Sequence, residues 1–176
     1  MHRSPPLALA RLLDALYRVC IWAAGIAITL MSLVVPVGVF MRYVLGVGAR
    51  WPEPIAILLM VVFSFMGAAA AYRAGVHIAV DMFTQRLPIG LRTLVARLVD
   101  GLMLLVCVFV VWFGARLSYQ TMGQSISELP WLAVGITYAP IPIGAALTLV
   151  FIIERMIWGP QTHRAVVRMG DVEKTA

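Results

Sequence analysis

The residues in this chain that could carry out acid–base, nucleophilic or metal chemistry are few and scattered. The three histidines, His2, His77 and His163, lie outside the long apolar stretches, and the cysteines Cys20 and Cys107 show no metal-ligand spacing. Catalytic and metal sites need several such groups close together. The sequence also contains no phosphate-binding glycine loop and no carboxylate pair. We therefore predict that the protein is not an enzyme and uses neither a cofactor nor a metal.

Asp100 is the only charged residue inside the four long apolar stretches. A proton relay would need a second acidic residue at membrane depth, and these stretches contain none. Arg97 lies three residues earlier on the same helical face, which favours an ion pair with Asp100. Cys20 and Cys107 lie inside the stretches, and we predict that both are buried, reduced thiols that pack as small apolar residues.

The four long apolar stretches of the chain position its few ionisable residues. The chain is 62% hydrophobic and 12% charged, whereas a soluble domain carries about 25% charged residues. Each stretch is about long enough to cross a hydrocarbon core of ~30 Å as a helix, the form that satisfies its own backbone hydrogen bonds in lipid. We predict an all-α membrane protein with four transmembrane helices. The stretches are Val19–Met41, Ile55–Tyr72, Leu98–Ala115 and Trp131–Ile153.

Basic residues at the ends of the stretches predict the orientation. Of the 14 lysines and arginines, 11 lie in the two tails and the second connection, and three (Arg42, Arg50 and Arg116) lie in the first and third loops. The positive-inside rule then places both termini in the cytoplasm. We expect a multi-pass protein of the bacterial inner membrane, with the first and third loops facing the periplasm. The scatter of basic residues argues against nucleic-acid binding.

Three regions are predicted along the chain. Residues 1–18 form a basic amphipathic segment, residues 19–157 form the membrane domain, and residues 158–176 form a charged tail. The predicted spans cover about residues 19–41, 55–72, 91–117 and 131–153, and we expect them to form one compact four-helix unit. Residues 73–88 are predicted to form a short amphipathic helix in the membrane interface, with Arg73, His77 and Asp81 on its polar face.

Small residues in the second span form a candidate helix-packing face. This face contains Ser64, Gly67, Ala68 and Ala71. Small side chains let helices approach closely in lipid. The face is compatible with packing inside the bundle and with docking against another membrane protein.

Two prolines interrupt the fourth span. Pro140 and Pro142 each remove a backbone donor, so we expect a kink or a local opening of the helix there. Broken helices mark substrate sites in some transporters. Because only Thr137 and Tyr138 offer polar groups nearby, we favour a role in shape.

An ordered series of motifs accompanies the four spans. The motifs are Arg42-Tyr43, Trp51-x-Glu53, the small-residue run from Gly67 to Arg73, His77-Ile78-x-Val80-Asp81, Leu129-Pro130 and Pro142-Ile143-Gly144. With this series the chain resembles the small integral-membrane subunit of tripartite ATP-independent periplasmic (TRAP) transporters, the DctQ-type family, over about residues 15–157. Pro54 departs from the family pattern, where a second acidic residue is expected after Glu53.

This resemblance implies a three-part importer. A periplasmic binding protein captures an organic acid, often a carboxylate, and a large membrane subunit moves it inward with a sodium gradient. The small subunit supports the large one, seats it in membrane lipid and helps to receive the binding protein. On this interpretation Arg42, Arg50, Trp51 and Glu53 lie on the periplasmic side as partner contacts or as a brace, with Arg42 paired to Glu53.

Two other classes of membrane protein remain as alternatives. A membrane anchor of a respiratory enzyme usually ligates haem through histidines inside its spans, and these spans contain none. A stand-alone small exporter needs an embedded carboxylate to couple protons, and the first two spans have none. A haem absorbance band, or transport by this chain alone, would favour one of these alternatives.

Overall fold

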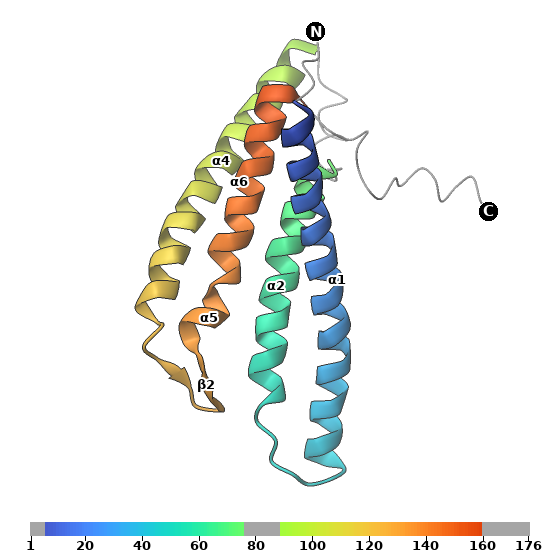
Figure 1. Cartoon of the computed structure of the whole chain (residues 1–176), viewed down its shortest axis with the longest axis vertical. Helices are drawn as coiled ribbons and strands as arrows, with labels where there is room; N and C mark the ends of the chain where they lie inside the picture. The colour runs from blue at the N-terminus through green and yellow to red at the C-terminus, as the bar shows by residue number, and fades with distance from the viewer. Residues whose placement is uncertain (1–5, 76–88, 160–176) are drawn as a thin grey trace, which may run out of the picture.

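The computed structural model describes residues 6–75 and 89–159, and it is dominated by helices (Figure 1). Within these residues, four helical segments are long and apolar enough to cross a membrane, which confirms the predicted all-α membrane class with four spans. The long helices are α1 (Leu7–Tyr43), α2 (Pro52–Arg73), α4 (Ile89–Gln120) and α6 (Pro140–Trp158); the shorter elements are β1 (Ser125–Ile126), β2 (Leu129–Ala133) and α5 (Val134–Tyr138). Most of the predicted interfacial helix, including His77 and Asp81, lies outside the described residues.

The helix boundaries follow local chemistry. Helix α2 begins with Pro52, whose missing N–H costs nothing in a first turn, and Glu53 beside it complements the helix dipole. Helix α6 ends at Trp158 and is followed by Gly159, which has a φ of 82° and is the residue type suited to that conformation. Helix α1 starts at Leu7 and runs without interruption to Tyr43, so residues 7–18 are its first turns.

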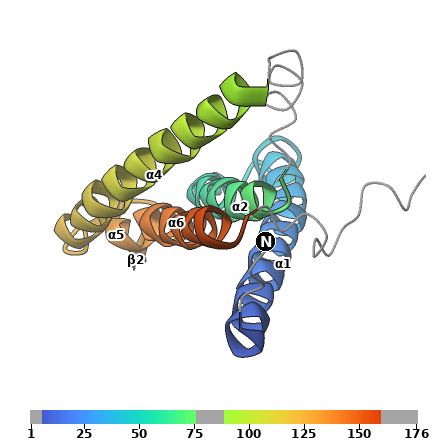
Figure 2. The same ribbon diagram turned by 90° about the horizontal axis from the view of Figure 1, so that it is seen from above.

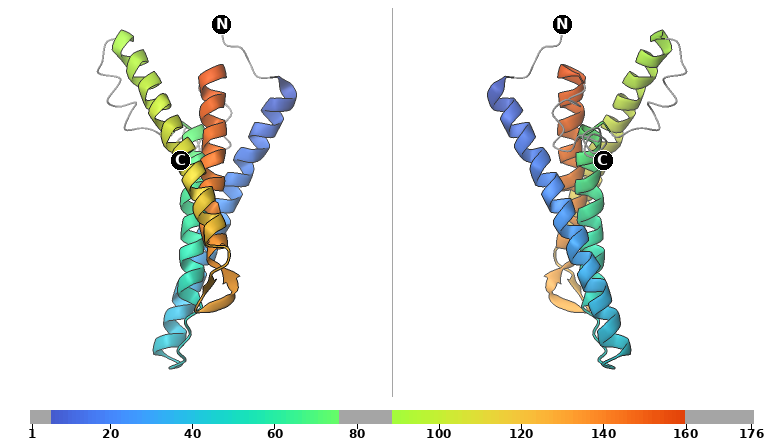
Figure 3. Two further views of the ribbon diagram at one scale, coloured as in Figure 1. Left: turned by 90° about the vertical axis from the view of Figure 1, so that its left-hand side faces the viewer. Right: turned by 90° about the vertical axis from the view of Figure 1, so that its right-hand side faces the viewer.

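The long helices form an open row and not a closed bundle. Helix α1 packs on α2, α2 packs on α6, and α6 packs on α4. Seen from above, the order across the row is α1–α2–α6–α4 (Figure 2). The two edge helices, α1 and α4, diverge toward the end that carries the N-terminus (Figure 3). The four-helix unit is therefore an open row, and not compact as we expected.

Tight packing is concentrated toward the same end of the row. Phe151 and Ile152 of α6 and Cys20 of α1 are the largest fully buried side chains among the described residues. Cys20 and Cys107 are both buried and free, as predicted. These four residues belong to one hydrophobic cluster, which also contains Leu13, Tyr17, Ala24, Met66, Ala69 and Tyr72. Many of the remaining large apolar side chains are exposed, as expected for helices whose surroundings are lipid.

A small β-hairpin joins α4 to α5, and the sequence did not predict it. Strands β1 and β2 pair antiparallel, so residues 131–133, which were expected to open the fourth span, belong to β2. The apolar character of Leu132 and Trp131 made this segment look like part of a span. The hydroxyl of Ser118 in α4 donates to the carbonyl of Gly135 at 2.7 Å, which joins α5, the element after the hairpin, to α4.

Candidate functional site

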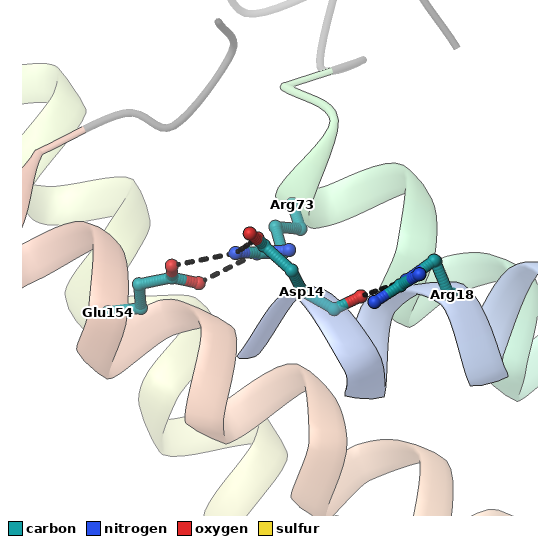
Figure 4. A network of polar contacts seen from close by, with 4 residues as sticks. All are labelled: Asp14, Arg18, Arg73 and Glu154. Atoms are coloured by element: carbon teal, nitrogen blue, oxygen red, sulfur yellow. Dashed lines mark hydrogen bonds and ion pairs between the residues drawn. The ribbon is translucent and has the colours of Figure 1, made fainter. Parts of the chain in front are cut away.

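Arg73, at the end of α2, is the centre of a buried ionic cluster that joins three helices (Figure 4). Its Nε donates to Oε2 of Glu154 at 2.8 Å, and its Nη2 donates to Oε1 of the same carboxylate at 3.0 Å. The same Nη2 donates to Oδ1 of Asp14 at 2.6 Å. The side chains of Arg73 and Glu154 are only 4% and 3% exposed. One guanidinium therefore connects α1, α2 and α6.

Two aromatic rings enclose this guanidinium. The Cζ atom of Arg73 lies 5.2 Å from the ring centroid of Tyr17 and 5.4 Å from that of Phe151. Arginine is more weakly hydrated than lysine and stacks readily on aromatic faces. The rings and the bidentate carboxylate together offset the cost of removing these charges from water.

A second set of polar contacts lies beside the first. The hydroxyl of Tyr72 donates to Oδ1 of Asp100 at 3.1 Å, and Nε of Arg155 lies 3.6 Å from the same oxygen. The guanidinium of Arg155 also lies over the ring of Tyr72, 5.7 Å from its centroid. The structure thus pairs Asp100 with Arg155, whereas the sequence favoured Arg97, whose side chain is exposed.

These two sets form what we call the charged layer. Helix α2 contributes Arg73 to the first set and Tyr72 to the second, and helix α6 contributes Glu154 to the first and Arg155 to the second. The contacts therefore extend from α1 at one edge of the row to α4 at the other. Within the residues that the structure describes, no group of three His, Cys, Asp or Glu side chains could hold a metal ion. The arrangement holds helices together. The charged layer consists of Asp14, Tyr72, Arg73, Asp100, Glu154 and Arg155.

The opposite end of α1 and α2 carries a much weaker ion pair. Nη2 of Arg42 lies 3.9 Å from Oε2 of Glu53, and the two side chains are 55% and 74% exposed. An exposed pair of this kind contributes about 0–1 kcal/mol. Arg50 is exposed and Trp51 is half-buried in the loop beside them. We call this end, with Arg42, Arg50, Trp51 and Glu53, the hairpin end of the row, because helices α1 and α2 form a helical hairpin there; it is distinct from the β-hairpin.

The two ionic sites are spaced like the two faces of a membrane. Glu53 and Arg73 are about 30 Å apart along α2 at 1.5 Å per residue, which matches the ~30 Å hydrocarbon core of a bilayer. Charges are least costly at such boundaries. The charged layer and the hairpin end therefore fit the two interfaces of one membrane.

The predicted small-residue face is divided by the structure. The side chains of Ser64, Ala68 and Ala71 are exposed, whereas a Cβ atom on Gly67 would lie 3.9 Å from the Cβ of Ala24 in α1. Gly67 thus faces the neighbouring helix of the same chain. The other three residues remain available to a partner.

The predicted proline interruption coincides with a division of the fourth span. Helix α5 ends at Tyr138 and α6 begins at Pro140, with Ala139 between them. Pro142 lies two residues further on, where a Cβ on Gly114 of α4 would lie 3.2 Å from its Cδ. The prolines thus shape the contact between α4 and α6.

Asp14 and Glu154 are the residues that sequence reasoning missed. Asp14 fell within the predicted amphipathic segment 1–18 and Glu154 just beyond the fourth predicted span, and neither was given a partner. Arg73 was assigned to the interfacial helix. One signal was present, because opposite charges adjoin the same predicted end of three apolar spans. Charges at one membrane boundary on neighbouring helices are candidates for pairing.

The fold and the two ionic sites define a multi-pass membrane protein. Residues 31–160 match the family model of the DctQ component of tripartite ATP-independent periplasmic transporters. A relative from Haemophilus influenzae, named "Putative TRAP transporter small permease protein", is 25% identical over 130 residues, which cover 74% of this chain and 80% of the relative. The chain belongs to the DctQ family of TRAP transporter components.

Proposed function

We propose that this chain is the supporting membrane subunit of a sodium-driven TRAP importer of an organic acid. The large membrane subunit carries the substrate and the ions, and a periplasmic binding protein delivers the substrate. The observation that carries this proposal is the charged layer. Its buried charges are paired with one another across α1, α2, α4 and α6, so they serve the assembly of the row.

The orientation proposed here follows the distribution of charge. The tails and the second connection hold 11 of the 14 basic residues, and the charged layer lies at that end of the row. The positive-inside rule then places the charged layer at the cytoplasmic face of the inner membrane and the hairpin end at the periplasmic face. In this position Arg50 and Trp51 contact the binding protein, while Arg42 and Glu53 brace the ends of α1 and α2.

The open row suits a supporting subunit. A single layer of helices exposes two broad apolar faces, and a larger membrane protein can cover one of them while lipid covers the other. Within these faces, the exposed residues Ser64, Ala68 and Ala71 follow one stripe of α2. Small residues of this kind allow a partner helix to approach closely, so we assign this stripe to the large subunit.

Leucine at two positions of this stripe should weaken assembly. The double variant Ala68→Leu/Ala71→Leu adds bulk to exposed positions without disturbing the neighbours of Gly67. We expect recovery of the large subunit in co-purification to fall about tenfold, which corresponds to ~1.4 kcal/mol. The matched variant Ala68→Ser/Ala71→Ser keeps the side chains small and should retain the partner. Equal recovery with both variants would move the contact elsewhere on the row.

Reconstitution tests the function as a whole. The chain is placed in proteoliposomes with the large subunit, the binding protein and a sodium gradient, and uptake is measured for a panel of radiolabelled organic acids. We expect uptake only when all three proteins and the gradient are present. Uptake by this chain alone would favour the exporter alternative, and a haem absorbance band in the purified chain would favour the respiratory anchor.

A further inference from the structure

A groove lies between α1 and α2 at the hairpin end, outside the charged layer. It encloses a cavity of about 360 Å³. Its floor is closed by a near contact between the helices, because a Cβ on Gly38 would lie 2.8 Å from the Cβ of Pro52. Its mouth carries Arg42 and Glu53, and its walls are formed by Met31, Val35, Val39, Ala56, Ile57 and Met60.

We propose that this groove binds one phosphatidylethanolamine molecule, with an acyl chain along the apolar walls and the headgroup between Arg42 and Glu53. The length of the groove fits this ligand. Met31 and Arg42 are about 16 Å apart along α1 at 1.5 Å per residue, and half of a hydrocarbon core of ~30 Å is about 15 Å. The groove therefore extends from a membrane boundary to the midplane, as an acyl chain does.

The charges at the mouth match a zwitterionic headgroup. Arg42 can donate charge-assisted hydrogen bonds to the phosphate, and Glu53 can accept hydrogen bonds from the primary ammonium group. At 3.9 Å the two side chains are only loosely paired, and both are more than half exposed. A headgroup that carries both charges can thus join the pair at little cost. A purely anionic headgroup would meet Glu53 as a like charge.

The walls have the exposure expected beside a bound lipid chain. The side chains of Val39, Ile57 and Met60 are 52%, 48% and 48% exposed. They are therefore neither sealed inside the chain nor fully turned outward, and an acyl chain would cover their remaining apolar surface. At the other end of the row, Leu13 and Tyr17 of α1 are buried by protein. At the groove end, a bound lipid chain would cover the apolar side chains of α1 in the way that protein covers them at the other end.

Native mass spectrometry of the full chain tests the proposal directly. The protein is purified in detergent and titrated with phosphatidylethanolamine, phosphatidylcholine or phosphatidylglycerol. We expect one phosphatidylethanolamine molecule to bind at least fivefold more tightly than either other lipid. Phosphatidylcholine lacks the N–H groups that donate hydrogen bonds to Glu53, and phosphatidylglycerol lacks the positive charge. Equal affinity for the three lipids, or tighter binding of phosphatidylglycerol, would overturn the proposal.

Matched variants locate the site. Ala56→Trp fills the groove and should reduce the affinity for phosphatidylethanolamine about tenfold, whereas Val37→Trp places the same side chain on an exposed part of α1 that does not line the groove. Arg42→Gln/Glu53→Gln should abolish the preference among the headgroups, and Arg116→Gln, an exposed arginine of α4, should preserve it. Equal binding by Ala56→Trp and Val37→Trp would contradict the assignment.

Photo-crosslinking identifies the occupant of the groove in the assembled transporter. Its result does not depend on whether the Ala56→Trp variant folds. A benzophenone amino acid replaces Ile57, a wall residue, and the complex is irradiated in membranes that contain phosphatidylethanolamine. A phospholipid adduct on this chain supports the proposal. A crosslink to another protein would show that a partner subunit fills the groove and would overturn it.

Discussion

Replacing Arg73 with alanine should destabilise the chain by about 3–5 kcal/mol, because it leaves a buried carboxylate without its counter-charge. Glu154 is 3% exposed and loses both hydrogen bonds from the guanidinium. Asp14 is 36% exposed, so it can regain water and should contribute less to the loss. The measurement is equilibrium unfolding of the purified chain in mixed detergent micelles.

Three further variants separate the charge from the geometry. Arg97→Ala removes an exposed arginine of α4 and should change the free energy of unfolding by less than about 0.5 kcal/mol. Arg73→Lys keeps the charge but cannot form the bidentate contact, so its stability should be intermediate. Arg73→Met/Glu154→Met removes both buried charges and should recover most of the loss. If Arg73→Ala were as stable as Arg97→Ala, the charged layer would not hold the row together.

Alanine at Gly144 should separate α2 from α6. A Cβ there would lie 2.6 Å from the Cβ of Phe65 and 3.0 Å from its backbone carbonyl atoms. Because the obstacle is backbone and Cβ, no side-chain rotation relieves it and the helices must move. Overpacking of this kind costs about 1–3 kcal/mol, and Gly144→Leu should cost more. Thermal unfolding of the purified chain should show a lower midpoint for both variants.

Gly101 provides the matched control for this substitution. It lies in α4 with nothing within 4 Å of the position of its Cβ, so Gly101→Ala changes helix propensity without adding a collision. We expect this variant to be at least as stable as the native chain. Equal midpoints for Gly144→Ala and Gly101→Ala would show that α2 and α6 can separate freely, which would contradict the close contact at Phe65.

The covalent sequence predicts the helices well and their partners poorly. Length and hydropathy identify four spans because lipid forces each apolar segment to satisfy its own backbone hydrogen bonds. Pro140 lies where the fourth span divides, since proline cannot donate within a helix. The hairpin at residues 125–133 was missed because its apolar residues look like the start of a span.

The sequence did not indicate the helix order, and it placed opposite charges at one predicted membrane boundary without indicating which of them pair. Helix α2 is apolar on all sides between Ile55 and Tyr72, so no amphipathic stripe indicates which face packs against a neighbour. Arg73 meets Asp14 and Glu154, which are 59 and 81 residues away in the chain. Asp100 had a plausible local partner in Arg97, yet the structure brings Arg155 to it from another helix.

The amino-acid sequence by itself determined the class of protein, the number of membrane spans and the DctQ resemblance, because these depend on composition, segment length and motif order. The tertiary structure decided that the helices form an open row, that Arg73 joins three of them and that a groove remains between α1 and α2. The physical reason is that lipid defines what can span a membrane, whereas side-chain shape and buried charge decide which spans meet.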